Sequence, residues 1–156
     1  MRHKKPILFV EDECVDAMMA KRALREINIP NRLIIARNGE DALSFLRKAD
    51  EKPCIILLDL NMPRMNGLEF LKVIKQDERL KRIPVIVLTG SNENQDVAES
   101  FIQGVAGYMV KPLDYSQYLT IMRIIMNYWS YSELPRDIED PPEAQIPIIE
   151  PLKIHE

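Results

Sequence analysis

The chain has 156 residues, of which 46% are hydrophobic and 29% charged, and its formal net charge at pH 7 is −3. This length and composition are typical of one soluble domain with a full hydrophobic core and room for a short appendage. The slightly acidic balance gives no support to a nucleic-acid partner, which would favour a basic face. No apolar run is long enough for a signal peptide or a membrane span, so we expect a cytoplasmic protein.

Short apolar runs alternate with segments of helical periodicity along the chain. The runs predict five buried strands, at 7–10, 33–36, 55–58, 85–88 and 107–110. The periodic segments predict five helices, at 15–27, 40–48, 67–76, around 97–102 and at about 115–131. In the first helix we expect one apolar face, made of Val15, Met18, Met19, Ala23, Leu24 and Ile27. Pro30 ends that helix, and Asn38-Gly39 marks a turn.

This alternation predicts an α/β fold with a five-stranded parallel sheet covered by helices on both faces. In such sheets, sites form at the carboxyl ends of the strands. Chemically distinctive residues stand at four of these ends: Glu11-Asp12, Asp59, Thr89-Gly90-Ser91 and Lys111-Pro112. The sequence therefore predicts that three carboxylates, a hydroxyl and an ammonium meet at one edge of the sheet.

These residue types together suit the acceptance of a phosphoryl group. Three clustered carboxylates repel one another, and a divalent cation with oxygen ligands, Mg²⁺ by preference, relieves that repulsion. A carboxylate such as Asp59 can act as nucleophile and form an aspartyl phosphate. Lys111, Thr89 and a backbone N–H would neutralise the phosphoryl oxygens. Singly, each residue has an ordinary explanation as a turn, cap or surface residue, but four strand ends rarely agree by coincidence.

The chain lacks the residues for several other chemistries. Its two cysteines, Cys14 and Cys54, have neither a disulfide framework nor metal-ligand spacing. We expect both to behave as small hydrophobic residues, with a redox role for Cys14 as the less favoured alternative. The only histidines, His3 and His155, lie at the chain ends. A zinc site, a histidine-based catalyst and a phosphohistidine carrier are therefore not expected.

The segments ILFVED, IILLDLNMPRMNG, PVIVLTGS and GYMVKP resemble the signature segments of response-regulator receiver domains of two-component signalling. The resemblance covers about residues 6–131. It implies a doubly wound, flavodoxin-like sheet with strand order 2-1-3-4-5. It also implies that Asp59 is the phosphoacceptor and that Asp12, Asp59 and the backbone carbonyl of Asn61 bind Mg²⁺. Glu11, which replaces the commoner Asp of the acidic pair, would support the metal through water.

The resemblance implies roles for the remaining strand ends as well. Lys111 would contact the phosphoryl group across a cis Lys111-Pro112 bond. Thr89 would be the switch hydroxyl, and Tyr108 the aromatic that swings inward when Thr89 engages the phosphate. Asn61 and Ser91 match positions that tune dephosphorylation. Gly90 replaces the usual Ala after the switch threonine, and its backbone freedom bears on the kinetics of the switch.

Residues 132–156 form a Pro-rich C-terminal extension that is too short for a separate output domain. The last helix carries a stripe with core spacing, made of Tyr118, Met122, Ile125, Met126 and Trp129. A second apolar stripe, of Ile121, Ile124 and Tyr128, predicts packing against a partner, most simply a second copy of the chain. The alternative is that the extension folds back over this stripe. Its apolar residues, Ile146 to Ile154, favour an arm lying on its own or a neighbouring protomer.

The function predicted from these features is that of a single-domain response regulator. It would take a phosphoryl group on Asp59 from a sensor histidine kinase and act through protein contacts or a phosphorelay with a phosphotransfer protein. The pieces LDLNMP and LKRIPVIVLTGS are similar to single-domain regulators that partner cyanobacterial phytochromes, which suggests a phytochrome-type kinase. We expect no enzymatic activity beyond self-catalysed phosphotransfer and dephosphorylation.

Two other functions compete with this one. A phosphohydrolase that resembles the haloacid dehalogenase family would need a second Asp two residues after the nucleophile, where this chain has Asn61. A binding module that works without phosphorylation would not need the intact set of Asp12, Asp59, Thr89 and Lys111.

Overall fold

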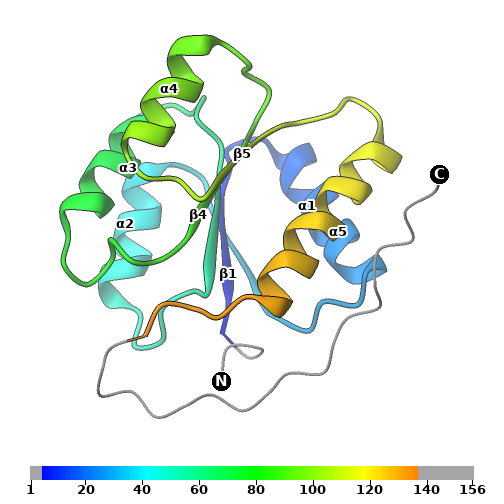
Figure 1. The fold of residues 1–156 in the computed structure, drawn as a ribbon, viewed down its shortest axis with the longest axis horizontal. Coiled ribbons are helices and arrows are strands. Elements are labelled where there is room, and N and C mark those ends of the chain that lie inside the picture. The colour runs from blue at the N-terminus through cyan, green and yellow to red at the C-terminus, as the bar shows by residue number, and fades with distance from the viewer. Residues whose placement is uncertain (1–4, 137–156) are drawn as a thin grey trace.

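The computed structural model describes residues 5–136, and Figure 1 shows their α/β arrangement. Five strands and five helices alternate along the chain. The strands are β1 (Ile7–Val10), β2 (Leu33–Ala36), β3 (Ile55–Leu58), β4 (Val85–Thr89) and β5 (Gly107–Val110). The helices are α1 (Cys14–Glu26), α2 (Gly39–Lys48), α3 (Gly67–Gln76), α4 (Asn94–Ile102) and α5 (Tyr115–Tyr131).

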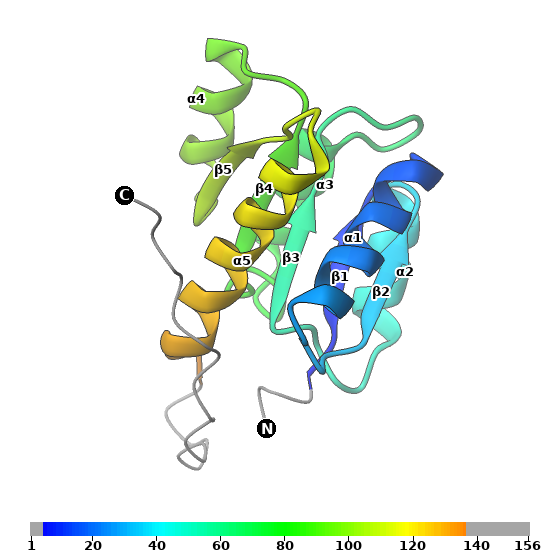
Figure 2. The same cartoon turned by 90° about the vertical axis from the view of Figure 1, so that its right-hand side faces the viewer.

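The strands form one parallel sheet in the order β2-β1-β3-β4-β5, as predicted. Helices α1 and α5 cover one face, and α2, α3 and α4 cover the other (Figures 1 and 2). Alternate strand residues point to opposite faces. In β1, Ile7 and Phe9 pack with α1 and α5, whereas Leu8 and Val10 pack with α2 and α3. The strands are therefore apolar without interruption because both faces are buried.

Most predicted boundaries agree with the structure to within two or three residues, and two differences have a local cause. Strand β4 continues to Thr89, so this threonine, the predicted switch hydroxyl, is still held in the sheet. Helix α2 begins at Gly39 rather than after a turn, because Asn38 is its N-cap. The Asn38 side chain accepts a hydrogen bond of 2.8 Å from the backbone N–H of Asp41. The prediction of an Asn38-Gly39 turn was therefore wrong: the same residues start a helix.

The predicted apolar face of α1 is partly wrong. Val15 and Met18 are exposed, and the buried side chains of the helix are Ala17, Ala20, Ala23 and Leu24. Small alanines at a spacing of three residues let the helix lie close to the sheet and to α5. Larger apolar residues one position away from this face then point outward.

Helix α5 confirms the predicted core stripe, and the second stripe is made of partly buried and exposed residues. Tyr118, Met122, Ile125 and Met126 are buried against the sheet, and Trp129 packs beside them. In the second stripe, Ile121 is half-buried, and its buried part packs against the same core. Ile124 and Tyr128 remain exposed, at 41% and 62%. The predicted contacts of Ile146 to Ile154 lie outside the described residues.

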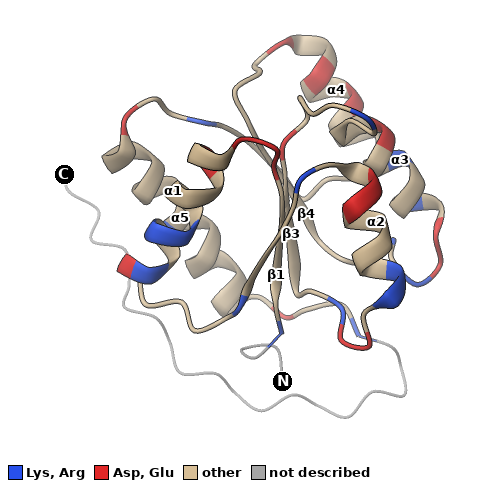
Figure 3. Ribbon diagram, turned by 180° about the vertical axis from the view of Figure 1, so that it is seen from behind, with Lys and Arg blue, Asp and Glu red and all other residues tan. Residues whose placement is uncertain are grey.

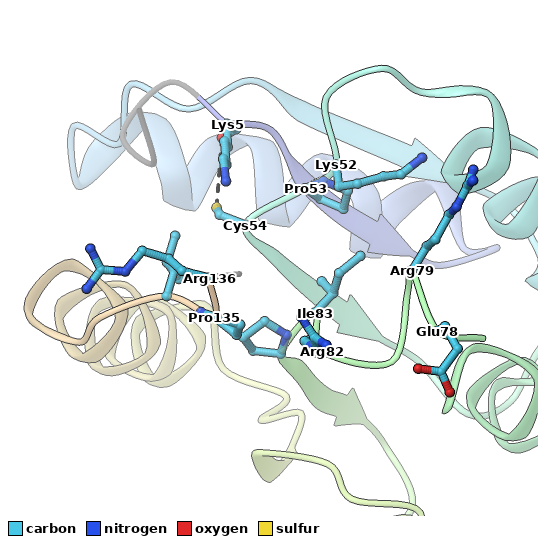
Figure 4. A pocket seen from close by; sticks show the side chains of 12 residues that line it. Lys5, Lys52, Pro53, Cys54, Glu78, Arg79, Arg82, Ile83, Pro135 and Arg136 are labelled. Atoms are coloured by element: carbon cyan, nitrogen blue, oxygen red, sulfur yellow. Dashed lines mark hydrogen bonds between the residues drawn. The ribbon is translucent and has the colours of Figure 1, made fainter. Parts of the chain in front are cut away.

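A pocket of about 470 Å³ opens at the amino end of the sheet (Figure 4). It is bounded by the segments before β1, β3 and β4 and by the segment after α5. Its charged lining residues are Lys5, Lys52, Glu78, Arg79, Arg82 and Arg136. Because these segments precede the strands, the pocket lies at the end of the sheet opposite to the predicted site. No helix among residues 5–136 is both long and apolar enough to cross a membrane.

Candidate functional site

Three carboxylates meet at the carboxyl end of the sheet, as the strand ends predict. Oxygens of Glu11, Asp12 and Asp59 all lie within 4.8 Å of one another. Glu11 and Asp59 are buried, and Asp12 is half-buried. Figure 3 shows acidic segments of the chain coming together at this edge.

The sheet itself fixes these acids, because its hydrogen bonds continue one residue past the strands. The backbone N–H of Glu11 donates to the carbonyl of Ala36 at 2.9 Å. The N–H of Asp59 donates to the carbonyl of Val10 at 3.0 Å. Two adjacent parallel strands thus hold Glu11 and Asp59 side by side with little freedom of the main chain.

Lys111 supplies the cation of the cluster. Its Nζ lies 2.8 Å from Glu11 Oε2, 2.8 Å from Asp16 Oδ2 and 3.8 Å from Asp59 Oδ2. Burial by itself would lower the pKa of Lys111, but the hydrogen bonds to Asp16 and Glu11, with the neighbouring negative charges, raise it above its ordinary value. The lysine is therefore a fixed positive charge between acids.

Glu11 has a strongly perturbed environment. Burial, against the opposing hydrogen bond from Lys111, raises the pKa of Glu11 from 4.5 to about 7, and the charge of Asp59 contributes to the rise. Its Oε1 also accepts a hydrogen bond of 3.2 Å from the backbone N–H of Glu13. A nearby positive charge therefore stabilises the ionised form of this carboxylate.

Thr89 ends β4 and Tyr108 lies in β5, so both are on the side of β3 away from β1 and Glu11. The Thr89 hydroxyl, fully buried, donates to Asp59 Oδ1 at 2.7 Å. The Tyr108 hydroxyl donates to the backbone carbonyl of Ser91 at 2.8 Å, and the Ser91 hydroxyl donates to Asp96 Oδ2 at 2.6 Å. The half-buried Tyr108 ring is thus tied to the segment that follows Thr89. A rearrangement at Asp59 has a short physical path to Tyr108 through this segment.

The donor set fits a hard divalent cation. Asp12 Oδ1 is buried and has no hydrogen-bond partner among the described residues, which is costly unless something else satisfies it. All three acidic side chains offer oxygen, the ligand type that Mg²⁺ and Mn²⁺ prefer. The predicted fourth ligand, Asn61, follows Asp59 by two residues, and its backbone N–H lies 3.5 Å from Asp59 Oδ1.

The predicted cis bond between Lys111 and Pro112 is wrong for this structure, in which residues 5–136 contain no cis peptide bond. The trans form of a bond to proline is favoured by about 0.5–1 kcal/mol unless the surroundings require the other form. Here the trans bond already allows Lys111 Nζ to reach Glu11. The contacts of the lysine thus give no reason for a cis bond.

Two glycines near Asp59 have different surroundings. A Cβ on Gly67 would lie 2.4 Å from the carbonyl oxygen of Asp59 and 2.6 Å from Leu60 Cα. Gly67 therefore lets the loop after β3 close onto the strand end. A Cβ on Gly90 would meet nothing within 4 Å. The Gly90 position is open, so it has room for an alanine side chain.

Asp16 is a member of the cluster that the sequence reasoning missed. It lies in the first turn of α1, and its carboxylate pairs with Lys111 at 2.8 Å. Helical side chains tilt toward the N-terminus of their helix, which here is the end next to the strand edge. An acid in the first turn of the helix that follows the acidic pair was therefore an available signal.

The fold and this edge of the sheet define a class of protein. The family model of the "Response regulator receiver domain" matches residues 7–123 of the chain. The chain belongs to this family, whose members are phosphoacceptor signalling domains of two-component systems.

Individual relatives include small regulators that the chain covers almost completely. The chain is 38% identical over 130 residues to "Response regulator Rcp1" of Synechocystis sp., a match covering 80% of this chain and 88% of that protein. The crystal structure of the phosphorylated cyanobacterial phytochrome response regulator RcpA superposes with a TM-score of 0.80 at 35% identity, covering 85% of this chain and 99% of that one. The Mn²⁺-bound form of Rcp1 gives 0.78 at 37% identity, with the same coverage.

Proposed function

We propose that Asp59 is the residue that accepts the phosphoryl group in this response regulator. The observation that carries the assignment is the contact set of its carboxylate: Thr89 on one oxygen, Lys111 near the other and two further acids alongside. In the reaction, an Asp59 oxygen attacks phosphorus, the bond from phosphorus to the donor's leaving atom breaks, and the leaving group keeps that electron pair. Lys111 and Thr89 lie where they can stabilise the transferred oxygens.

We propose Mg²⁺ as the physiological metal, held by Asp12, Asp59 and the Asn61 carbonyl with support from Glu11. Bound there, the ion would neutralise charge on the carboxylates and on a phosphoryl oxygen. The buried, unpartnered Asp12 Oδ1 and the oxygen-only donor set support this assignment. The Mn²⁺-bound structure of Rcp1 shows that a relative takes a divalent cation.

Receivers take their phosphoryl group from histidine kinases or phosphotransfer proteins. We propose a phytochrome-type histidine kinase as the donor for this chain. The support is the similarity to RcpA, described as a cyanobacterial phytochrome response regulator. Purified candidate kinases, labelled with radioactive phosphate, would be compared for transfer to the chain within seconds. A cognate kinase outpaces the others, and equal slow transfer from all of them would contradict the assignment.

We propose further that the outer face of α5 joins two copies of the chain. Ile124 and Tyr128 are exposed there, and Tyr131 continues the same helix with 55% of its surface exposed. Ile124→Glu places a charge in the middle of this face and is expected to halve the mass measured by sedimentation. Lys21→Glu, which changes an exposed residue of α1, is the control. An unchanged mass in the Ile124 variant would rule this interface out.

Acetyl phosphate tests the central assignment. With Mg²⁺, intact-mass spectrometry of the wild type is expected to show a gain of one phosphoryl group, and Asp59→Asn is expected to lose that gain. Rapid consumption of acetyl phosphate without a stable gain would point to a hydrolase. No gain and no consumption would point to a binding module that works without phosphorylation.

A further inference from the structure

Lys111 has three carboxylate neighbours, and they lie at unequal distances from its ammonium. Its ammonium is within hydrogen-bond distance of Glu11 and Asp16, at 2.8 Å each. Asp59 Oδ2 is 3.8 Å away, a distance that allows attraction between charges but no hydrogen bond. In the structure, the lysine is therefore bonded to two acids that are not the proposed phosphoacceptor.

The two bonded acids differ in the free-energy cost of losing their hydrogen bond to the lysine. The Glu11 side chain is 0% exposed, whereas that of Asp16 is 28% exposed. A buried carboxylate that loses its cation stays desolvated and unpaired, which is strongly unfavourable. A carboxylate in contact with water replaces the lost hydrogen bond with water at small cost. Asp16 is thus the releasable partner of Lys111, and Glu11 the permanent one.

A phosphoryl group on Asp59 would compete for the same lysine. It brings two negative charges and three acceptor oxygens into a position next to Lys111, which is 13% exposed. The ammonium has three N–H donors, two of which bond Glu11 and Asp16, so the third can reach one phosphoryl oxygen, and a second bond to the phosphoryl group requires the release of a present partner. The bond to Asp16 is the one that costs least to redirect.

We propose that Asp16 is a positioning residue that holds Lys111 in the unphosphorylated protein and exchanges it for the phosphoryl group, so that Asp16 slows phosphorylation of Asp59. This inference rests on the proposed role of Asp59. Asp16 acts through Lys111, whereas Lys111 and Thr89 would touch the phosphoryl group itself. The charge of Asp16 also repels an incoming anionic donor, and this repulsion works in the same direction.

The test is the rate at which the full chain gains a phosphoryl group from acetyl phosphate at saturating Mg²⁺. Asp16→Asn removes the charge and keeps the size of the side chain. We expect it to react about two- to fivefold faster than wild type, the size of effect that a partly exposed ion pair can produce. Asp16→Glu restores a carboxylate within reach of Lys111 and is expected to return the rate toward that of wild type.

Glu13→Gln is the matched control, because Glu13 is an exposed acid just before α1 that has no bond from Lys111. Its rate should stay close to that of wild type if the effect of Asp16 depends on contact with the lysine. Melting temperatures of all variants are measured in the same buffer. Damage to the fold would slow the reaction, so a faster reaction cannot come from structural loss. Asp16→Ser is the second charge-free variant if Asp16→Asn does not fold.

The outcomes separate this inference from the function on which it rests. If wild type gains a phosphoryl group and the charge-free Asp16 variants react at the same rate or slower, the inference is wrong and the assignment of Asp59 stands. If Glu13→Gln accelerates the reaction as much as Asp16→Asn does, the effect depends on charge in general and not on contact with Lys111. That result would also overturn the inference. If wild type gains no phosphoryl group, both proposals fail.

Discussion

At the carboxyl end of the sheet the charged groups are mostly buried and bonded to one another, whereas at the amino end they line an open pocket. Lys111 at the carboxyl end bonds to Glu11 and Asp16. At the amino end, Lys52 donates to the backbone carbonyls of Leu46 and Ala49. Arg136 pairs with Glu133 at 3.4 Å, and the side chains of Lys52 and Arg136 point away from one another (Figure 4).

The two ends therefore differ in whether charged side chains are bonded to one another away from water or lie around an opening that water can reach. Burial makes the interactions of Glu11 and Asp59 strong, and it makes the loss of their partners expensive, whereas the partly exposed Asp16 is the exception at this end. At the amino end, water can replace a lost partner, so the charges there have little power to organise a reaction. Both ends are rich in charge, and burial distinguishes them.

The largest effect is expected from removing the cation of the buried cluster. Lys111→Ala leaves Glu11 and Asp59 without their positive neighbour, which should lower the free energy of unfolding by about 3–5 kcal/mol. Lys52→Ala removes a lysine at the amino end that hydrogen-bonds backbone carbonyls, and should cost about 1 kcal/mol. Urea denaturation with EDTA present measures both. Equal losses would mean that the two ends do not differ in the way described.

The next largest effect is expected at Gly67, where the carboxyl end is most crowded. Gly67→Ala would push a Cβ against the backbone of Asp59 and Leu60, which cannot move without shifting the end of β3. Such overpacking typically costs about 1–3 kcal/mol, and we expect the upper part of this range. Urea denaturation measures the loss, and a slower reaction with acetyl phosphate should accompany it. An unchanged urea midpoint would show that the loop after β3 can accommodate the added methyl group.

Thr89→Val tests the hydrogen bond on Asp59 with little change in volume. The buried Asp59 Oδ1 loses the hydroxyl at 2.7 Å, which should cost about 1–3 kcal/mol. Thr120→Val is the control, because that hydroxyl lies on the exposed side of α5 and donates to the carbonyl of Ser116. Thermal or urea unfolding of both variants gives the comparison. If Thr120→Val lowers stability as much as Thr89→Val does, burial of the hydrogen bond does not explain the loss.

The smallest effect is expected at Gly90, which lies at the carboxyl end but in an open place. Gly90→Ala meets no atom within 4 Å, so stability should change by less than about 1 kcal/mol, with a gain as the expected sign. The lifetime of the aspartyl phosphate, followed by intact mass after removal of the donor, reports on the switch separately. A large loss of stability would mean that this segment is more constrained than its surroundings indicate.

The strands and the principal site residues could be predicted because they depend on local patterns and a general rule. A continuous apolar run such as Ile55–Leu58 is buried on both faces wherever it lies in the sheet. Parallel strands place their carboxyl ends at one edge, so the residues that follow them meet. Asp12, Asp59, Thr89 and Lys111 could therefore be assigned to one site before any contact was known.

The errors concern residues whose surroundings are set by other parts of the chain. Val15 and Met18 have helical spacing but lie outside the face that α5 and the sheet cover. Ile121 packs partly against the chain's own core, a contact that its place in the second stripe did not indicate. Asp16 joins the cluster because α1 starts immediately beyond the acidic pair and aims its first turn at Lys111.

By itself, the sequence determined the class of fold, the order of its elements and the identity of the acid at the end of β3. Periodicity, capping residues and strand-end chemistry are local properties, and they are written in neighbouring residues. Only the tertiary structure decided which acid holds Lys111, at what distance the lysine stands from Asp59, and which of its partners water can reach. These depend on burial and on contacts between residues up to 100 positions apart, such as Glu11 and Lys111, which no local pattern specifies.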